Sequence, residues 1–156
     1  MLKLVDVYTE IAETRVATKF LYELLKEREP NQNISHREMP SYEDHVRFVD
    51  SHPYREWFVI FEEWGSIETG PIGAIYLTNP PKPSQAGNEI GIFISKAYRE
   101  RGYGKQAVRL LMKMHPAERL LANIAPGNAE SIAMFEKLGF KLCQHTFELR
   151  PEDTQC

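Results

Sequence analysis

The second half of the chain shows a regular change of hydrophobic period, and this feature constrains the fold more than any other. Short β-rich runs follow one another there, separated by stretches with the apolar spacing of amphipathic helices. The predicted order is a strand at 89–94, a helix at 104–115, a strand at 120–124, a helix at 129–138 and a strand at 141–149. Because strands that alternate with helices place those helices on the faces of a sheet, a mixed α/β fold is predicted.

The last predicted helix has clear signals at both ends. Asn128 can cap its start, because a side-chain oxygen at this position accepts a bond from a free backbone N–H. Gly139 suits the left-handed conformation that often follows the last turn. Ile132, Phe135 and Leu138 line one face, so this helix is predicted to pack on the sheet.

The first part of the chain adds a strand and two helices. A strand is predicted at 2–7, followed by one amphipathic helix whose apolar residues run over 11–25 and which stops near Pro30. Ser41 and Asp44 resemble a capping box with a shorter acid, and they predict the start of a second helix that ends before the next proline.

Two further β-rich runs lie at 57–61 and 72–77. They are separated by Gly65 and by Gly70 and Pro71, which is typical of an antiparallel hairpin with a long connection. With this hairpin, the predicted fold class is α/β (α+β): a mixed, mostly antiparallel central sheet flanked by helices.

Length and composition exclude several classes of protein. A chain of 156 residues suits a single domain over 1–156, and the Pro-rich stretch at 79–88 is short enough to be a surface loop. The formal net charge of −3 argues against nucleic-acid binding, and no stretch is apolar enough to predict a membrane span. Cys143 and Cys156 form neither a disulfide framework nor a metal-ligand spacing, and no signal peptide is recognised, so a cytoplasmic protein without a metal is expected.

The stretch YRERGYGKQAVRLL predicts an anion-binding turn ahead of a helix. Gly102 and Gly104 let the backbone turn sharply and point N–H groups outward, next to the positive end of the helix dipole. Arg99, Arg101 and Lys105 add positive charge, and the arginines offer forked donors to phosphate oxygens. A solvent-exposed helix start, in which the glycines only separate the loop from the helix, explains the same residues.

A dinucleotide site is disfavoured, although GYGKQA also fits the pattern G-x-G-x-x-A. That motif needs its first glycine directly after a strand, and seven residues separate Ile94 from Gly102. It also needs an acidic residue at the tip of the next strand, where the sequence is LLANIAPGN.

An ordered set of motifs resembles the GCN5-related N-acetyltransferase (GNAT) family. RERGYG resembles its R/Q-x-x-G-x-G/A signature, NAESIAMFEKLGF resembles its later helix, and GPIGAIYL and NEIGIFIS resemble its third and fourth strands. The resemblance implies acetyl-CoA as the acyl donor, an amine as the acceptor and direct transfer through a tetrahedral intermediate.

The resemblance also implies which residues bind the donor. The pyrophosphate is expected on the turn, at Arg99, Arg101, Gly102, Tyr103, Gly104 and Lys105. The pantetheine arm is expected along the backbone of Ile92, Phe93 and Ile94, in the manner of an added strand. Asn123 and Asn128 match polar positions near the cofactor arm, although Asn128 is explained equally well as a helix cap.

The resemblance also bears on the proton-handling groups. Many relatives carry a tyrosine as the general acid where this chain has Phe135, which is expected beside the cofactor but cannot donate a proton. The coenzyme A thiolate can instead leave without an acid and take its proton from solvent. Glu89, at the start of the fourth strand, is the favoured general base, and Gly91 on the same face is expected to leave room for the acceptor. A solvated strand-end acid is the alternative for Glu89, and His145 is the alternative base.

The predicted function is therefore an N-acetyltransferase for an unidentified small amine, amino sugar or protein N-terminus, acting as a monomer or homodimer. A non-catalytic acyl-CoA-binding module is the alternative. The acceptor pocket is expected to involve residues in or before the first strand of the hairpin: His36, Glu38, Tyr42, Glu43 and Trp57. Side chains that are simply solvated at the surface would explain the same pattern.

Overall fold

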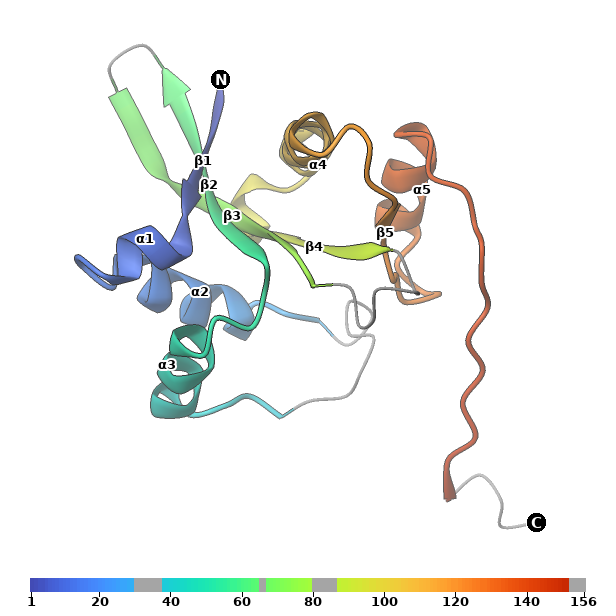
Figure 1. Ribbon diagram of the computed structural model, residues 1–156, viewed down its shortest axis with the longest axis horizontal. Coiled ribbons are helices and arrows are strands. Elements are labelled where there is room, and N and C mark those ends of the chain that lie inside the picture. Colours follow the sequence, from blue (N-terminus) through green and yellow to red (C-terminus); the bar gives the residue numbers. More distant parts are fainter. Residues whose placement is uncertain (30–37, 65–66, 80–86, 152–156) are drawn as a thin grey trace.

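The computed structural model describes residues 1–29, 38–64, 67–79 and 87–151 (Figure 1). Five strands form one sheet in the order β1-β2-β3-β4-β5. Their bounds are β1 Leu2–Asp6, β2 Glu56–Trp64, β3 Ile67–Leu77, β4 Asn88–Ile94 and β5 Leu120–Leu121. Strands β1 to β4 pair antiparallel, and only the β4–β5 pair is parallel. The predicted fold class, a mixed and mostly antiparallel sheet with flanking helices, is confirmed.

Helices cover both faces of this sheet (Figure 1). Helices α1 (Val7–Ile11), α2 (Val16–Lys26) and α3 (Tyr42–Asp50) lie on one face, and α4 (Tyr103–Met114) and α5 (Ala129–Lys137) lie on the other. Each face has its own buried core, because alternate side chains of a strand point to opposite sides. No helix in the described part of the chain is long and apolar enough to cross a membrane.

The helix predicted over 11–25 is two helices, so that prediction was wrong in its continuity. The chain breaks at Arg15, whose φ of 59° is left-handed. Beyond the break, the carboxylate of Glu10 accepts hydrogen bonds from the backbone N–H groups of Val16 and Ala17, at 3.0 and 2.9 Å. A side chain of α1 thus caps α2, which sequence spacing alone does not reveal. The second predicted helix is α3, and Ser41 caps it by accepting from the N–H of Asp44 at 3.1 Å.

The hairpin strands are longer than predicted, and the long connection is absent. Strand β2 continues to Trp64 and β3 begins at Ile67, so Gly70 and Pro71 lie within a strand. Pro71 is tolerated there because the register shifts next to its partner Phe61, and a bulge needs fewer ladder hydrogen bonds.

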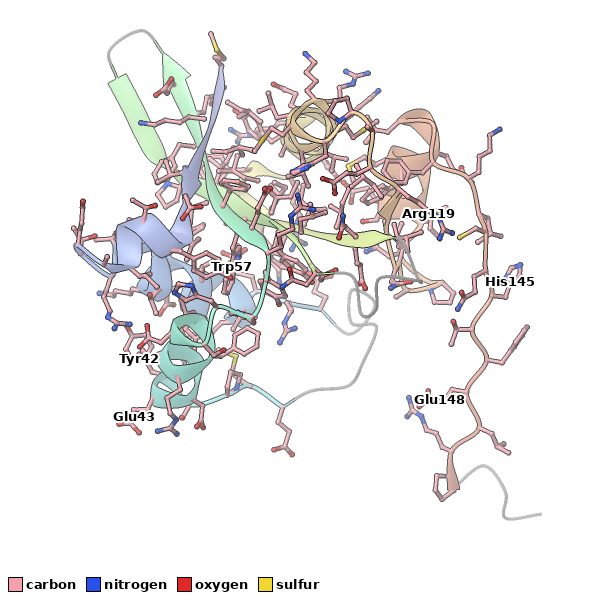
Figure 2. All side chains as sticks on the ribbon, viewed as in Figure 1. Tyr42, Glu43, Trp57, Arg119, His145 and Glu148 are labelled. Carbon is pink, nitrogen blue, oxygen red and sulfur yellow. The ribbon has the colours of Figure 1, made fainter. Side chains whose placement is uncertain are left out.

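The second half of the chain follows the predicted order with one exception. Asn128 caps α5 by accepting from the N–H of Ser131 at 3.2 Å, and Gly139 after the helix has a φ of 93°, as predicted. Strand β5, however, holds only two residues. The strand predicted at 141–149 is not formed, and residues 141–150 run as an exposed extended segment. Figure 2 shows His145 and Glu148 on this segment, away from the sheet.

Candidate active site

The start of α4 presents free backbone donors. Gly102 precedes the helix with a φ of 77°, and no side chain among the described residues caps it. The N–H groups of Tyr103, Gly104 and Lys105 are therefore in the first turn, where an α-helix supplies no acceptor. A Cβ at Gly104 would lie 3.2 Å from Sδ of Met134, so the absent side chain keeps this helix end close to α5 and open to a ligand. The geometry fits an anion, as the sequence predicts.

The basic residues around this turn are held in different ways. Nε of Arg99 donates to the carbonyl of Ile94 at 3.1 Å, and its guanidinium lies 5.2 Å from the centre of the Phe93 ring. Its Nη2 atom is buried and has no hydrogen-bond partner among the described residues. Arg101 is exposed beside the Tyr98 ring, and Lys105 is half-buried. Nη1 of Arg99 lies 3.8 Å from Oε1 of Glu29, so Arg99 is fixed at the end of β4 on its Phe93 side.

The edge of β4 that faces β5 is open over most of its length. The two strands pair only at Asn88–Leu120 and Glu89–Leu121. On its other edge β4 pairs with β3 through to Ile94. The backbone groups of Ile92 and Ile94 therefore point to an edge that no strand covers among the described residues, and Arg99 occupies the Ile94 carbonyl; those of Phe93 point to β3. An extended ligand can add to this edge as a strand does.

Glu118 fixes the point from which β4 and β5 diverge. Its carboxylate accepts two hydrogen bonds from Arg55, at 2.7 and 3.0 Å, and one from Asn88. Nδ1 of the buried His115 lies 3.0 Å from the same carboxylate. The hydrogen bonds from Arg55, followed by that of His115, lower the pKa of Glu118 to about 2. These contacts tie the residue before β2, the end of α4 and the start of β4 together beside Leu120, and no sequence pattern signals this cluster.

Two further carboxylates support the turn, and no sequence pattern predicted either of them. Glu27, just after α2, accepts from Oγ of Ser95 at 3.0 Å and from the N–H of Lys96 at 2.7 Å. Glu62 of β2 accepts from the hydroxyl of Tyr103 at 2.6 Å, which raises the pKa of that tyrosine. The ring of Tyr103 is therefore tied to the sheet, and only its backbone N–H faces the anion position.

The other predicted donor-site residues follow β5. Asn123 is exposed, and Asn128 is half-buried with its Oδ1 engaged as the α5 cap. Phe135 is 5% exposed and packs edge-to-face on Phe140 at 5.0 Å between ring centres. Phe135 thus belongs to the core beneath α5, where it contributes apolar burial and no proton.

Glu89 is half-buried at the start of β4. Its backbone N–H donates to Oγ1 of Thr78 at 2.9 Å. The strand register places it on the same face as Gly91 and Phe93, opposite α4 and α5. The room expected at Gly91, however, is filled: a Cβ there would lie 1.9 Å from Cζ of Tyr76, whose ring stacks on Tyr54 at 3.9 Å. An acceptor would therefore meet aromatic rings beside Glu89.

The remaining candidates do not gather around Glu89. His145 is exposed on the extended segment after α5, on the far side of the molecule from α3 (Figure 2). Tyr42 and Glu43 are exposed on α3, Glu38 precedes that helix, and His36 lies outside the described residues. Trp57 is 6% exposed and packs edge-to-face on Tyr54, so surface solvation does not explain it, and its place in an acceptor pocket stays a prediction.

The uncapped start of α4 lies beside the open edge of β4, where β4 and β5 diverge. Proteins with this arrangement can bind a ligand that is elongated and partly anionic. Residues 5–141 match the family described as Acetyltransferase (GNAT) domain. The chain therefore belongs to the GNAT family. This match confirms the family resemblance and the expected class of enzyme, an acetyltransferase; members of the family use acetyl-CoA.

Solved structures with the same fold cover nearly the whole chain. A domain from Methanocaldococcus jannaschii has a TM-score of 0.75 and 20% identity, over 95% of this chain and 93% of its own. A ribosomal-protein-alanine N-acetyltransferase from Brucella melitensis has a TM-score of 0.65 and 18% identity, over 92% and 86%. A mycothiol acetyltransferase from Corynebacterium glutamicum is 39% identical over 54 residues, which are 33% of this chain and only 18% of that protein.

Proposed function

We propose that this chain transfers an acetyl group from acetyl-CoA directly to a primary amine. The observation that carries the proposal is the open edge of β4 at Ile92 and Ile94, which a short turn joins to the uncapped start of α4. Acetyl-CoA combines an extended pantetheine arm with a pyrophosphate, and the two features suit these two parts.

The donor would lie with its pyrophosphate on the N–H groups at Gly102, Tyr103, Gly104 and Lys105. Arg101 and the side chain of Lys105 supply charge from the rim. Arg99 would steady the turn from the Phe93 side, where it also lies near Glu29. The pantetheine amides would pair with the free backbone edge of residues 92–94, next to Asn123 and the amide nitrogen of Asn128. These residues hold and orient the donor, which supplies the thioester carbonyl.

Glu89 would act as the general base that takes a proton from the acceptor ammonium. A carboxylate at the start of β4 attracts a cationic amine, and the half-buried position limits competition from water. The buried Phe135 provides no acid; coenzyme A can leave as a thiolate because a thiol is acidic enough to do so near neutral pH. One protein base is then sufficient.

The aromatic rings beside Glu89 suit an ammonium acceptor. Tyr76 and Tyr54 stack with an interplanar angle of 6°, and Tyr76 is half-buried at Gly91. Ring faces attract cations, and the Glu89 carboxylate would add a full opposite charge. The acceptor class remains a primary amine of a small molecule, an amino sugar or a protein N-terminus.

A thiol-release assay over a panel of amines tests this function. The panel holds polyamines, amino sugars and peptides with a free N-terminus, including the N-terminal alanine suggested by the Brucella melitensis relative. Release of coenzyme A that depends on one amine class supports catalysis. Tight acetyl-CoA binding with no release across the panel favours the second candidate, an acyl-CoA-binding module, which the lack of a proton donor at Phe135 motivates.

A further inference from the structure

The turn that joins β4 to α4 has little regular structure of its own. It runs from Ser95 to Gly102 and contains one short 3₁₀-helix, η2 (Lys96–Tyr98). Glu100 and Gly102 are both left-handed, with φ values of 62° and 77°. A residue other than glycine keeps this conformation only when its surroundings hold it there. The turn therefore depends on contacts from elsewhere to place the N–H groups at the start of α4.

Glu27 supplies such contacts from the other side of the sheet. It directly follows α2, whereas α4 covers the opposite face (Figure 1). One oxygen of its carboxylate accepts from Oγ of Ser95 at 3.0 Å, and the other accepts from the backbone N–H of Lys96 at 2.7 Å. The hydroxyl of Ser95 does not cap η2, so Glu27 takes that place. Because a carboxylate is a stronger acceptor than a neutral oxygen, these two bonds are a firm tie between α2 and the turn.

Charge alone gives no reason for an acidic residue here. A carboxylate near the site of a pyrophosphate opposes its binding, because like charges repel. The neighbouring Glu29 pairs with Nζ of Lys96 at 3.1 Å, but both side chains are exposed, so this ion pair contributes little. The benefit of Glu27 therefore lies in the geometry that its two hydrogen bonds impose.

We propose that Glu27 is a positioning residue for the acyl donor: it fixes the turn that presents the N–H groups of α4, and it thereby couples α2 to donor binding. This inference rests on the proposed function, because it takes the turn to be the pyrophosphate site. Both contacts of Glu27 lie at the β4 end of the turn, so it would act by placing the turn and not by touching the donor. Since coupling is reciprocal, a donor that fixes the turn also steadies the end of α2.

Calorimetric titration of the full chain with coenzyme A tests this role. Glu27→Ala removes both hydrogen bonds and should raise the dissociation constant by about tenfold, the factor expected if the turn then keeps its binding geometry about one tenth of the time. Glu27→Gln can still accept from Lys96 and donate to Ser95, so its dissociation constant should stay within about threefold of that of the wild type. Glu23→Ala is the matched control, because it removes the same charge from α2 and Glu23 pairs with Lys26; it should also stay within about threefold.

Kinetics and hydrogen exchange separate positioning from a merely structural role. Glu27→Ala should raise the KM for acetyl-CoA by about tenfold and change kcat by less than about threefold. Saturating coenzyme A should slow the exchange of the amides of residues 26–28 in the wild type, and Glu27→Ala should lose this protection. Glu27 is only half-buried, so all three variants are expected to fold, which their melting transitions verify.

Other results would overturn the inference. Equal or tighter binding in Glu27→Ala would mean that Glu27 is at most a repelling charge, and equal weakening in Glu27→Gln would make the charge responsible instead of the hydrogen bonds. Weakening in Glu23→Ala would implicate α2 as a whole, and protection of residues 26–28 that persists in Glu27→Ala would show coupling through other contacts. A wild type that does not bind coenzyme A would refute the proposed function and this inference together, whereas wild-type binding that Glu27→Ala leaves unchanged would refute this inference alone.

Discussion

Gly91→Ala is expected to destabilise the fold because the new methyl group has no room. Its Cβ would lie 1.9 Å from Cζ and 2.3 Å from the hydroxyl oxygen of Tyr76. The ring cannot move aside freely, because it stacks on Tyr54 at 3.9 Å and Tyr54 in turn packs edge-to-face on Trp57 at 4.9 Å. Overpacking of this kind costs about 1–3 kcal/mol, and the depth of the overlap favours the upper end. For a chain of this size, about 3 kcal/mol lowers the melting temperature by roughly 6–12 °C.

Urea unfolding of a double-mutant cycle measures this effect. In a Tyr76→Ala background the methyl group has room, so the added cost of Gly91→Ala should fall below about 0.5 kcal/mol, giving a coupling energy of about 2.5 kcal/mol. Gly70→Ala is the matched control, because a Cβ at that glycine of β3 meets no atom within 4 Å; it should change stability by less than about 0.5 kcal/mol. An equal cost of Gly91→Ala in both backgrounds would refute the argument that Tyr76 fills this space.

Three further predictions concern the site and the helical layer. Gly104→Asp should weaken coenzyme A binding at least about tenfold in calorimetric titration, since it sets a negative charge at the start of α4, while the flexible Met134 lets the fold persist; unchanged affinity in a folded variant would contradict the anion site. Glu89→Gln should lower turnover by about 10²–10⁴-fold with coenzyme A affinity nearly unchanged; if turnover survives in Glu89→Gln and is lost in His145→Asn, His145 is the base. Burial lowers the pKa of His45, whose Nε2 lies 2.9 Å from the carbonyl oxygen of Thr18, so the unfolded chain binds the proton more readily. Unfolding free energy should therefore fall as the pH drops below about 6.5, and a His45→Gln variant that keeps the same fall would show that other groups cause it.

The parts of the site that local sequence predicts are those built from neighbouring residues. The predicted anion-binding turn needs only Gly102, Gly104 and a helix that starts beside them. In the structure Gly102 is left-handed and α4 starts directly after it. A free edge along β4 was expected from the family resemblance, and in the structure the backbone groups of Ile92 and Ile94 point to an uncovered edge, whereas those of Phe93 point to β3. The surroundings of Glu89 were not predictable, because Tyr76 crosses from β3 and fills the space over Gly91. The alternation of β4 gave the face of Glu89, but it could not give what the neighbouring strand places there.

The sequence by itself determined the elements whose stabilising contacts lie within one turn: the Ser41 cap of α3, the Asn128 cap of α5 and the left-handed Gly139 after it. Tertiary structure decided where α1 ends and α2 begins, because Glu10 caps a helix that starts six residues away. It also decided that 141–149 forms no strand. A helix satisfies its backbone hydrogen bonds within its own segment, whereas a strand needs an edge that some other segment must supply.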